Sequence, residues 1–258
     1  MTDRRSTPFS TIAAPALLLL MLSALLFSQG QPPIATDRPG FGTGATTVAP
    51  GAVQIESGLQ IDYPDDNTTV LTAPLAVIRT GLSERLEVNL AYPGWIRVDN
   101  GGSSTARSDL SLGGKLRLDR RGLLRTTLFG AATLPVGEDG ATSDQVDGLA
   151  GLAAEYQAGP GLGLSVSVQG GSAAGPDGRT GNGQVAVGIT TSNSDRLSSF
   201  VEYAATGLFG DLSTGQFLDA GFTFLAAPNV QLDISGGLGL TNASADFVSL
   251  GLSVRLPE

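Results

Sequence analysis

The chain has 258 residues, 36 of them glycine, a formal net charge of −9, and neither cysteine nor histidine. These absences exclude a disulfide framework, a metal site ligated by histidine or cysteine, and catalysis by a Ser-His-Asp triad or a Cys-His pair within the chain. The acidic balance argues against a nucleic-acid partner, which would need clustered lysine and arginine, and we expect no cofactor.

The first 30 residues have the pattern of a secretory signal peptide. Arg4 and Arg5 form a basic start, an apolar run covers Ile12–Phe27, and small residues follow up to Gly30. The run is shorter than the roughly 20 apolar residues that a spanning helix needs. We therefore predict a cleaved signal peptide over residues 1–30, with an uncleaved anchor as the alternative.

The next stretch, residues 31–51, is rich in proline, glycine and threonine, a composition typical of irregular structure. We predict a flexible, irregular periplasmic lead-in. The alternative is that Asp37 and Arg38 tuck into the domain that follows and act as a plug. That domain, residues 52–258, begins where polar and apolar residues start to alternate.

Alternation with a period of two predicts β-strands with one apolar face. The clearest example is the end of the chain, where Val248, Leu250, Leu252 and Val254 oppose Ser249, Gly251, Ser253 and Arg255. A strand containing Pro74 and three others have no clear phase. The predicted strands cover residues 52–62, 70–80, 86–92, 109–118, 123–134, 146–156, 162–169, 185–189, 197–204, 217–224, 230–235 and 248–256.

The connections between these strands alternate in length. Longer polar connections fall at 62–69, 93–107, 135–145, 171–182, 205–215 and 240–245, and short ones at 81–84, 119–122, 157–160, 191–195 and 226–229. Short periplasmic turns that alternate with longer extracellular loops are typical of a transmembrane barrel, whereas a Greek-key sandwich has no reason for such alternation. We expect the last strand to pair with residues 52–62 and close the sheet.

The distribution of charge favours lipid over a protein core as the neighbour of the apolar faces. In the clearest strands these faces carry no Lys, Arg, Asp or Glu, and a lipid-facing charge costs roughly 2–4 kcal/mol at the bilayer midplane. The sequence therefore predicts an all-β fold, a transmembrane antiparallel up-and-down β-barrel of about twelve strands, with ten to fourteen compatible. A secreted β-sandwich or a soluble barrel is the alternative. Aromatic residues near strand ends, among them Phe200, Phe217 and Phe224, fit an interfacial girdle or ordinary packing equally well.

A family resemblance covers nearly all of the chain after the leader. It is carried by Thr36-Asp37-Arg38-Pro39-Gly40-Phe41, PGAVQIESGLQ (50–60), RTGLSERLEVNLAYPGW (79–95), SDLSLGGKLRL (108–118) and LDAGFTFLAAPNVQLDISGGLGL (218–240). The chain resembles an outer-membrane β-barrel family assigned to transport in the phenol meta-degradation pathway. The resemblance implies passage of aromatic or other hydrophobic compounds and no specific substrate site. One departure is the terminus Leu256-Pro257-Glu258, which lacks the final aromatic residue that outer-membrane assembly machinery reads.

We therefore predict a channel or transporter in the outer membrane of a Gram-negative-type bacterium, with outer-membrane lipid, the assembly machinery and a small-molecule solute as partners. The sequence does not fix the oligomeric state. Solutes would pass a lumen of glycine, serine and mixed charges. The candidate lining residues are Glu56, Glu87, Asp109, Lys115, Arg117, Glu202, Asp219, Asp233 and Arg255.

Three alternatives stay open. Charges can set selectivity in a pore, but they can equally pair across a narrow barrel and fill it. A structural or surface-interaction barrel without an open pore is the second reading. An enzyme is the third and least favoured, because a carboxylate pair such as Glu87 and Asp109 more commonly forms structural salt bridges than acid–base machinery.

Overall fold

The computed structural model describes residues 32–119, 122–175, 178–208 and 211–256. The predicted signal peptide lies outside these residues. None of the described residues belongs to a helix long and apolar enough to cross a membrane. The strands are β1 Val53–Asp65, β2 Thr68–Gly81, β3 Leu86–Asp99, β4 Ser103–Arg107, β5 Leu110–Arg117, β6 Leu124–Leu134, β7 Asp147–Gly159, β8 Leu162–Gly175, β9 Gly178–Ser192, β10 Leu197–Leu208, β11 Asp211–Ala227, β12 Val230–Gly239 and β13 Asp246–Leu256.

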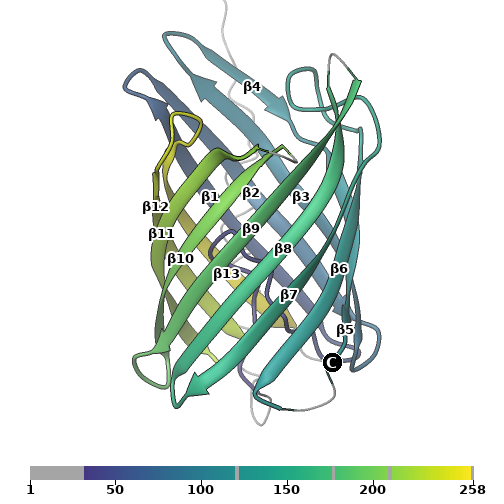
Figure 1. Ribbon diagram of the computed structural model, residues 1–258, viewed down its shortest axis with the longest axis vertical. Helices are drawn as coiled ribbons and strands as arrows, with labels where there is room; N and C mark the ends of the chain where they lie inside the picture. Colours follow the sequence, from purple (N-terminus) through teal and green to yellow (C-terminus); the bar gives the residue numbers. More distant parts are fainter. Residues whose placement is uncertain (1–31, 120–121, 176–177, 209–210, 257–258) are drawn as a thin grey trace, which may run out of the picture.

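These strands form one closed antiparallel barrel (Figure 1). Apart from β4 and β5, consecutive strands pair with each other, and β13 pairs with β1 from Val53↔Leu256 to Tyr63↔Asp246, as predicted. Both β4 and β5 pair with β3, so together they make one interrupted wall strand. Within the described residues the wall therefore has twelve strand positions, and closure leaves no unpaired edge to face hydrocarbon.

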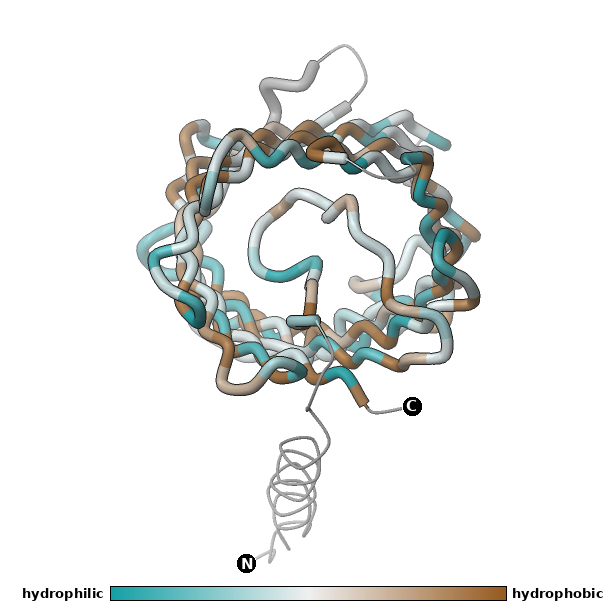
Figure 2. The backbone as a smooth tube through the Cα atoms, turned by 90° about the horizontal axis from the view of Figure 1, so that it is seen from below, coloured by the Kyte–Doolittle hydropathy of each residue, from teal (hydrophilic) through white to brown (hydrophobic). Residues whose placement is uncertain are grey.

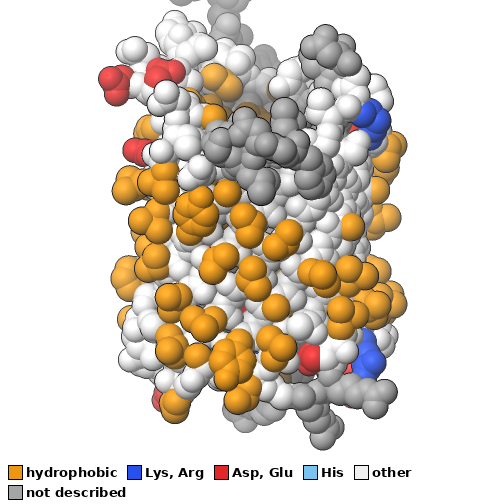
Figure 3. All heavy atoms as spheres, in the orientation of Figure 1, with side chains coloured by type: hydrophobic (Ala, Val, Ile, Leu, Met, Phe, Trp, Pro, Cys, Tyr) orange, Lys and Arg blue, Asp and Glu red, His pale blue; other side chains and the backbone are white. Residues whose placement is uncertain are grey.

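The barrel is apolar outside and polar inside, the reverse of a soluble protein. Apolar side chains cover the outer face seen in Figure 3, and the charged ones gather near its two ends. Phe222 is 50% exposed and Ile234 53%, whereas Glu56 and Glu87 on the inner face are 0% exposed. This distribution confirms the predicted transmembrane barrel, because an apolar outer band is what a bilayer accommodates.

The predicted lengths of the longer loops are largely wrong, although successive connections do alternate between the two ends of the barrel. β1 continues to Asp65 and β2 begins at Thr68, which leaves a two-residue turn where residues 62–69 were expected to form a loop. Most of 93–107, 171–182 and 205–215 is strand as well. Backbone pairing continues beyond the apolar band, where the outward side chains no longer need to be apolar. We call this end the long-hairpin end and the opposite one the short-turn end.

A bulge in β2 explains why its phase could not be assigned. Glu56 pairs with Val77 and Gln60 with Thr72, so β2 holds one residue more than β1 across the same stretch. The irregularity lies next to Leu75, which has a φ of 46°. One extra residue exchanges the two faces of a strand, and this exchange turns Arg79 into the lumen.

Residues 32–51 lie inside the barrel; we call them the plug. Figure 2, a view from the short-turn end, shows them as a loop within the ring of strands. The plug enters at the short-turn end, where the Ile34 amide donates to Pro228 O at 2.6 Å. It returns there to β1, and the Gly51 amide donates to Gly81 O at 2.9 Å. The segment is irregular as expected, but it follows the plug alternative and differs from the flexible lead-in that we favoured.

Candidate functional site

The plug is held mainly through its backbone. An irregular segment has no ladder for its N–H groups, so each needs another acceptor. Four glutamates of the barrel wall accept hydrogen bonds from five of these groups, and such charge-assisted bonds are roughly twice as strong as neutral ones. The pairs are Asp37 N to Glu56 at 3.1 Å, Phe41 N to Glu202 at 2.6 Å, Gly42 N to Glu202 at 3.1 Å, Ala45 N to Glu155 at 2.8 Å and Val48 N to Glu87 at 2.8 Å.

Arg79 stands at the centre of the buried charge network. Its side chain is 1% exposed and lies 2.7 Å from Glu56 Oε1 and 2.8 Å from Glu87 Oε1. Its Nη2 also donates to the plug carbonyl of Thr46 at 3.2 Å. Two strands and the plug therefore share one guanidinium, whose fork of donors suits several acceptors at once.

Asp37 brings the plug's own charge into this network. Lys115 Nζ lies 2.5 Å from Asp37 Oδ1, Arg79 Nη1 lies 3.5 Å from it, and the Gly44 amide donates to it. Burial raises the pKa of Asp37, but the charges of Arg79 and Lys115 and the hydrogen bonds from Lys115 and Gly44 outweigh burial and hold that pKa below 3.8. Asp37 is therefore ionised at neutral pH, which strengthens each contact it makes.

Arg38 anchors the plug to β12 and β13, beside β1. Its Nη2 lies 3.0 Å from Ser249 Oγ and 3.4 Å from Asp233 Oδ1. A Cβ atom added at Gly58 would lie 2.5 Å from Arg38 Nη2, and a Cβ atom added at Gly251 would lie 2.5 Å from Arg38 Nε. The two inward glycines thus leave the space that the guanidinium occupies.

Polar wall side chains also donate to plug oxygens. Gln184 Nε2 donates to Phe41 O at 2.8 Å, and Arg255 Nη2 donates to Pro32 O at 2.6 Å. Gln54 and Gln231 donate to Ala35 O and Thr36 Oγ1. The plug is therefore bound along its length rather than at a single point.

The structure places most of the predicted lining residues against the plug. Glu56, Glu87, Lys115, Glu202, Asp233 and Arg255 all contact it. Asp219 is 1% exposed on the inner wall, and Arg117 lies 3.9 Å from Asp119. Several of these charges pair inside the barrel, which was one of the two predicted roles.

Asp109 has a different position from the one predicted. Its two carboxylate oxygens accept hydrogen bonds from Gly137 N at 2.9 Å and Thr142 Oγ1 at 3.1 Å. It therefore fastens the loop after β6 instead of lining the lumen. Glu87 is engaged by Arg79 and Val48, so the structure does not bring Glu87 and Asp109 together as an acid–base pair.

Sequence reasoning missed the aromatic contacts in the lumen. The Phe41 ring lies 4.6 Å from that of Phe217 and 5.7 Å from that of Phe247, measured between centroids. Phe217 lies two residues before Asp219 and Phe247 two residues before Ser249, so each aromatic ring is on the same face of its strand as that polar residue. The alternation of the sequence therefore predicts that both rings face inward. Phe200 also faces inward, because it pairs with Thr190 beside the pair of Glu202 and Gly188. The girdle interpretation is therefore wrong for Phe200 and Phe217.

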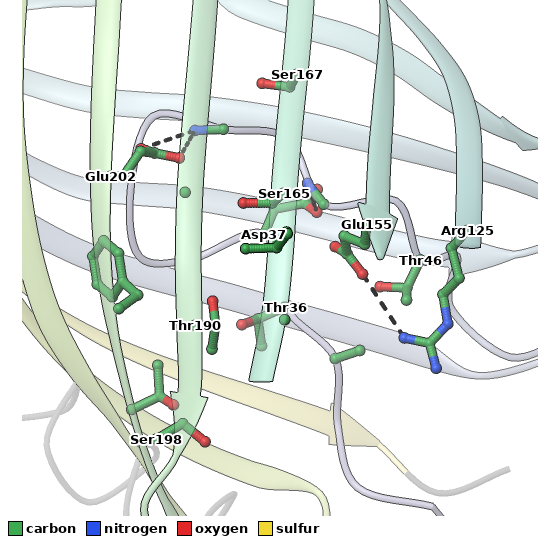
Figure 4. A pocket seen from close by; sticks show the side chains of 18 of the residues that line it. Thr36, Asp37, Thr46, Arg125, Glu155, Ser165, Ser167, Thr190, Ser198 and Glu202 are labelled. Atoms are coloured by element: carbon green, nitrogen blue, oxygen red, sulfur yellow. Dashed lines mark hydrogen bonds and ion pairs between the residues drawn. The ribbon is translucent and has the colours of Figure 1, made fainter. Parts of the chain in front are cut away.

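A cavity of about 460 Å³ separates the plug from the wall formed by β6 to β12. Hydroxyl side chains line it, including Ser165, Thr190 and Ser198 in Figure 4, which also shows Glu155 beside Arg125 and Glu202 against the plug. Most lining residues come from the ends of strands nearest the short turns, so the cavity lies in that half of the barrel. Among the described residues no group of three or more Asp, Glu, His or Cys could hold a metal ion.

The barrel is similar to solved outer-membrane channels. The COG4313 outer membrane channel from Pseudomonas putida F1 aligns with a TM-score of 0.64 and 12% identity, over 85% of this chain and 99% of that one. The NanC porin aligns with a TM-score of 0.56 and 8% identity, over 80% of this chain and 100% of that one. The KdgM porin in complex with disordered oligogalacturonate aligns with a TM-score of 0.53 and 7% identity, over 80% of this chain and 99% of that one. At these identities the likeness establishes the fold.

No curated protein sequence matches the chain. The model of one protein family does match, and it covers residues 36–256, from the middle of the plug to the last residue of β13. The matched region includes the motifs of the resemblance described above. The chain therefore belongs to the family described as "Putative MetA-pathway of phenol degradation".

Proposed function

We propose that the chain is an outer-membrane channel for passive passage of small hydrophobic or aromatic solutes, and that the plug controls its lumen. The observation that carries the proposal is a closed barrel whose polar lumen holds both the plug and a cavity of about 460 Å³. In the proposed orientation of the barrel in the outer membrane, the short-turn end faces the periplasm, because periplasmic turns are the short ones in such barrels. A signal peptide over residues 1–30 would direct export.

The charges of the lumen favour a neutral solute. Arg38, Arg79 and Lys115 are each paired with a carboxylate. They therefore do not form a row of free positive charges that could bind an anionic solute such as an acidic sugar. The family description supplies the aromatic class, and the hydroxyl-lined cavity suits a small solute with a polar group. We propose no enzymatic activity.

A barrel without an open pore is the second candidate. The density of hydrogen bonds between the plug and the wall favours it, because each bond opposes plug movement. The two candidates differ in what happens when the plug is fixed to the wall or removed from it.

An engineered disulfide makes that comparison direct. A Cβ at Gly42 would lie 3.6 Å from Ala186 Cβ, within the range that disulfides need, and the natural chain has no cysteine. Gly42→Cys/Ala186→Cys joins the plug to β9 when oxidised and frees it when reduced. Each single variant is a matched control.

Single-channel recording in planar bilayers provides the readout. For a channel with a mobile plug, the wild type shows discrete conductance, and oxidation of the double variant lowers it reversibly while the single variants do not respond. If the wild type is silent but deletion of residues 32–47 gives conductance, the native barrel is the closed form. If neither conducts nor passes solutes in proteoliposomes, the channel proposal is wrong.

A further inference from the structure

One row of inward-facing residues crosses four strands beneath Phe41. Glu202 of β10 pairs with Asp219 of β11, Asp219 with Gly237 of β12, and Gly237 with Phe247 of β13. Phe41 spans this row: its N–H donates to Glu202, and its ring contacts Phe247. Neighbouring strands lie only about 4.8 Å apart, so Phe41 lies over the two central residues, Asp219 and Gly237.

Asp219 is a buried polar group. It is 1% exposed, and in the part of the chain that the structure describes neither of its carboxylate oxygens has a hydrogen-bond partner in another residue. The neighbour on one side is another carboxylate, Glu202, whose oxygens are taken by the Phe41 and Gly42 amides. Burial of a polar group without a hydrogen bond is costly, and the phenyl ring of Phe41 has no donor that could remove that cost.

The surroundings of Asp219 are shaped for an aromatic ring. Phe217, two residues from Asp219 on β11, contacts the Phe41 ring at 4.6 Å, and Phe247 meets it edge-on at 5.7 Å. Both distances fall within the range in which aromatic pairs attract. A side chain at Gly237 would overlap the Phe247 ring, so this glycine lets the ring lie against the wall. Phe247 is the second residue of β13, near the long-hairpin end.

We propose that Phe217, Phe247 and Asp219 form a binding site for a small hydroxylated aromatic ring, and that Phe41 fills it when no solute is bound. The solute's ring takes the place of the Phe41 ring, and its O–H donates to the unpartnered carboxyl of Asp219. Phenol is the simplest such molecule. The site deepens the proposed channel function and rests on it, because a solute must enter the lumen to reach the site.

The plug is built so that the Phe41 ring can leave. Gly40 and Gly42 flank it, and Gly40 has a φ of 107° that favours glycine. The Phe41 backbone is fixed by Glu202 and Gln184, whereas its ring contacts other rings. A hydroxylated solute makes the same ring contacts and adds one hydrogen bond, so it has an advantage over the side chain that it displaces.

The test measures equilibrium binding to the folded barrel in detergent, by equilibrium dialysis against labelled phenol and anisole. Phe41→Ala vacates the site, and we expect it to bind phenol about tenfold more tightly than the wild type does. Phe224→Ala, on the lipid face and 43% exposed, is the matched control and leaves binding unchanged. Anisole has a ring but no donor, and we expect Phe41→Ala to bind it about fivefold more weakly than phenol.

Asp219→Leu in the Phe41→Ala background removes the acceptor, and the preference for phenol over anisole then disappears. Equal binding of the two solutes to Phe41→Ala, or an unchanged preference in Asp219→Leu, would overturn the proposal. Heat-modifiable gel migration checks that each variant is folded; if Asp219→Leu does not fold, the comparison of solutes in Phe41→Ala decides alone. Binding is measured without conductance, so phenol binding to a silent barrel would contradict the channel and leave the site standing.

Discussion

The guanidinium of Arg79 forms a bidentate ion pair with Glu87, with Nε 2.8 Å from Oε1 and Nη2 3.0 Å from Oε2. Both side chains are almost fully buried. A charge in such a place requires a partner, because desolvation costs several kcal/mol for each ion. Arg79 meets this requirement for Glu87 and also for Glu56, so two buried carboxylates depend on one side chain.

Replacing Arg79 should therefore destabilise the barrel strongly. Arg79→Met leaves Glu56 and Glu87 without their cation, and breaking a buried pair in this way costs about 3–5 kcal/mol. Urea unfolding of the barrel in detergent or lipid measures the loss. Arg97→Met is the control, because its ion pair with Asp99 is about half exposed and should matter little. Equal effects of the two substitutions would contradict the role of the network.

Glu202→Gln should have opposite effects on the plug and on the wall. The change weakens the hydrogen bonds from Phe41 and Gly42, which are stronger to a charged acceptor, so protease protection of the plug decreases. Glu202 is also directly opposite Asp219 in register, and like charges in that position destabilise a sheet. In a barrel without residues 32–47, Glu202→Gln should therefore leave unfolding stability unchanged or raise it. A loss of stability in that background would show that Glu202 supports the wall itself.

Asp37 should make plug docking sensitive to strong acid only. Its pKa is held below 3.8 in the docked state, so its stabilising contribution is complete above that value and is lost as pH falls through the lowered pKa. A spin label at Thr43→Cys, in the plug, reports on docking. Because Asp37 stays ionised, the label should remain immobile from pH 7 down to about pH 5, and it should gain mobility in stronger acid. The difference between the wild type and Asp37→Asn isolates this residue from the other carboxylates. A difference that changes between pH 5 and 7 would contradict the assignment.

The fold could be predicted from the sequence because lipid imposes a simple rule on every wall strand. Outward residues must be apolar, so the phase of β13 followed from the alternation, and its pairing with β1 followed from the closure of the predicted barrel. Arg79 could not be placed, because the bulge beside Leu75 exchanges the faces of β2 and no local pattern announces it. Loop lengths were overestimated, because strands that continue into water no longer need to alternate.

The plug depends on a different kind of information. Its contacts join residues such as Phe41 and Glu202 that are far apart in the chain, and they use backbone N–H groups, which every sequence has. No pattern in residues 31–51 shows which carboxylates those groups will meet. The inward phase of the predicted wall charges that contact the plug, such as Glu56 and Glu202, followed from the strand pattern, but their partners were not predictable from the strands alone.

The outer face should tolerate no charge at mid-strand. Ile234 lies in the middle of β12 and is 53% exposed, and Ile234→Arg should reduce folding into liposomes by roughly 2–4 kcal/mol if that face meets hydrocarbon. Val136→Arg is the control, because Val136 is 58% exposed in the loop after β6, outside the strands. If both variants fold equally well, the apolar band does not face lipid.

Gly237 should be sensitive to the smallest possible side chain. A Cβ there would overlap the Phe247 ring and lie 3.0 Å from Asp219 Cβ, so Gly237→Ala pushes the ring off the wall. Such overpacking typically costs about 1–3 kcal/mol, and urea unfolding measures it. Gly102→Ala is the control, since nothing lies within 4 Å of a Cβ at that position. The shift should also loosen the contact between Phe247 and Phe41, so plug protection against protease should fall in Gly237→Ala and stay unchanged in Gly102→Ala; a stable variant with full protection would mean that the ring does not depend on this glycine.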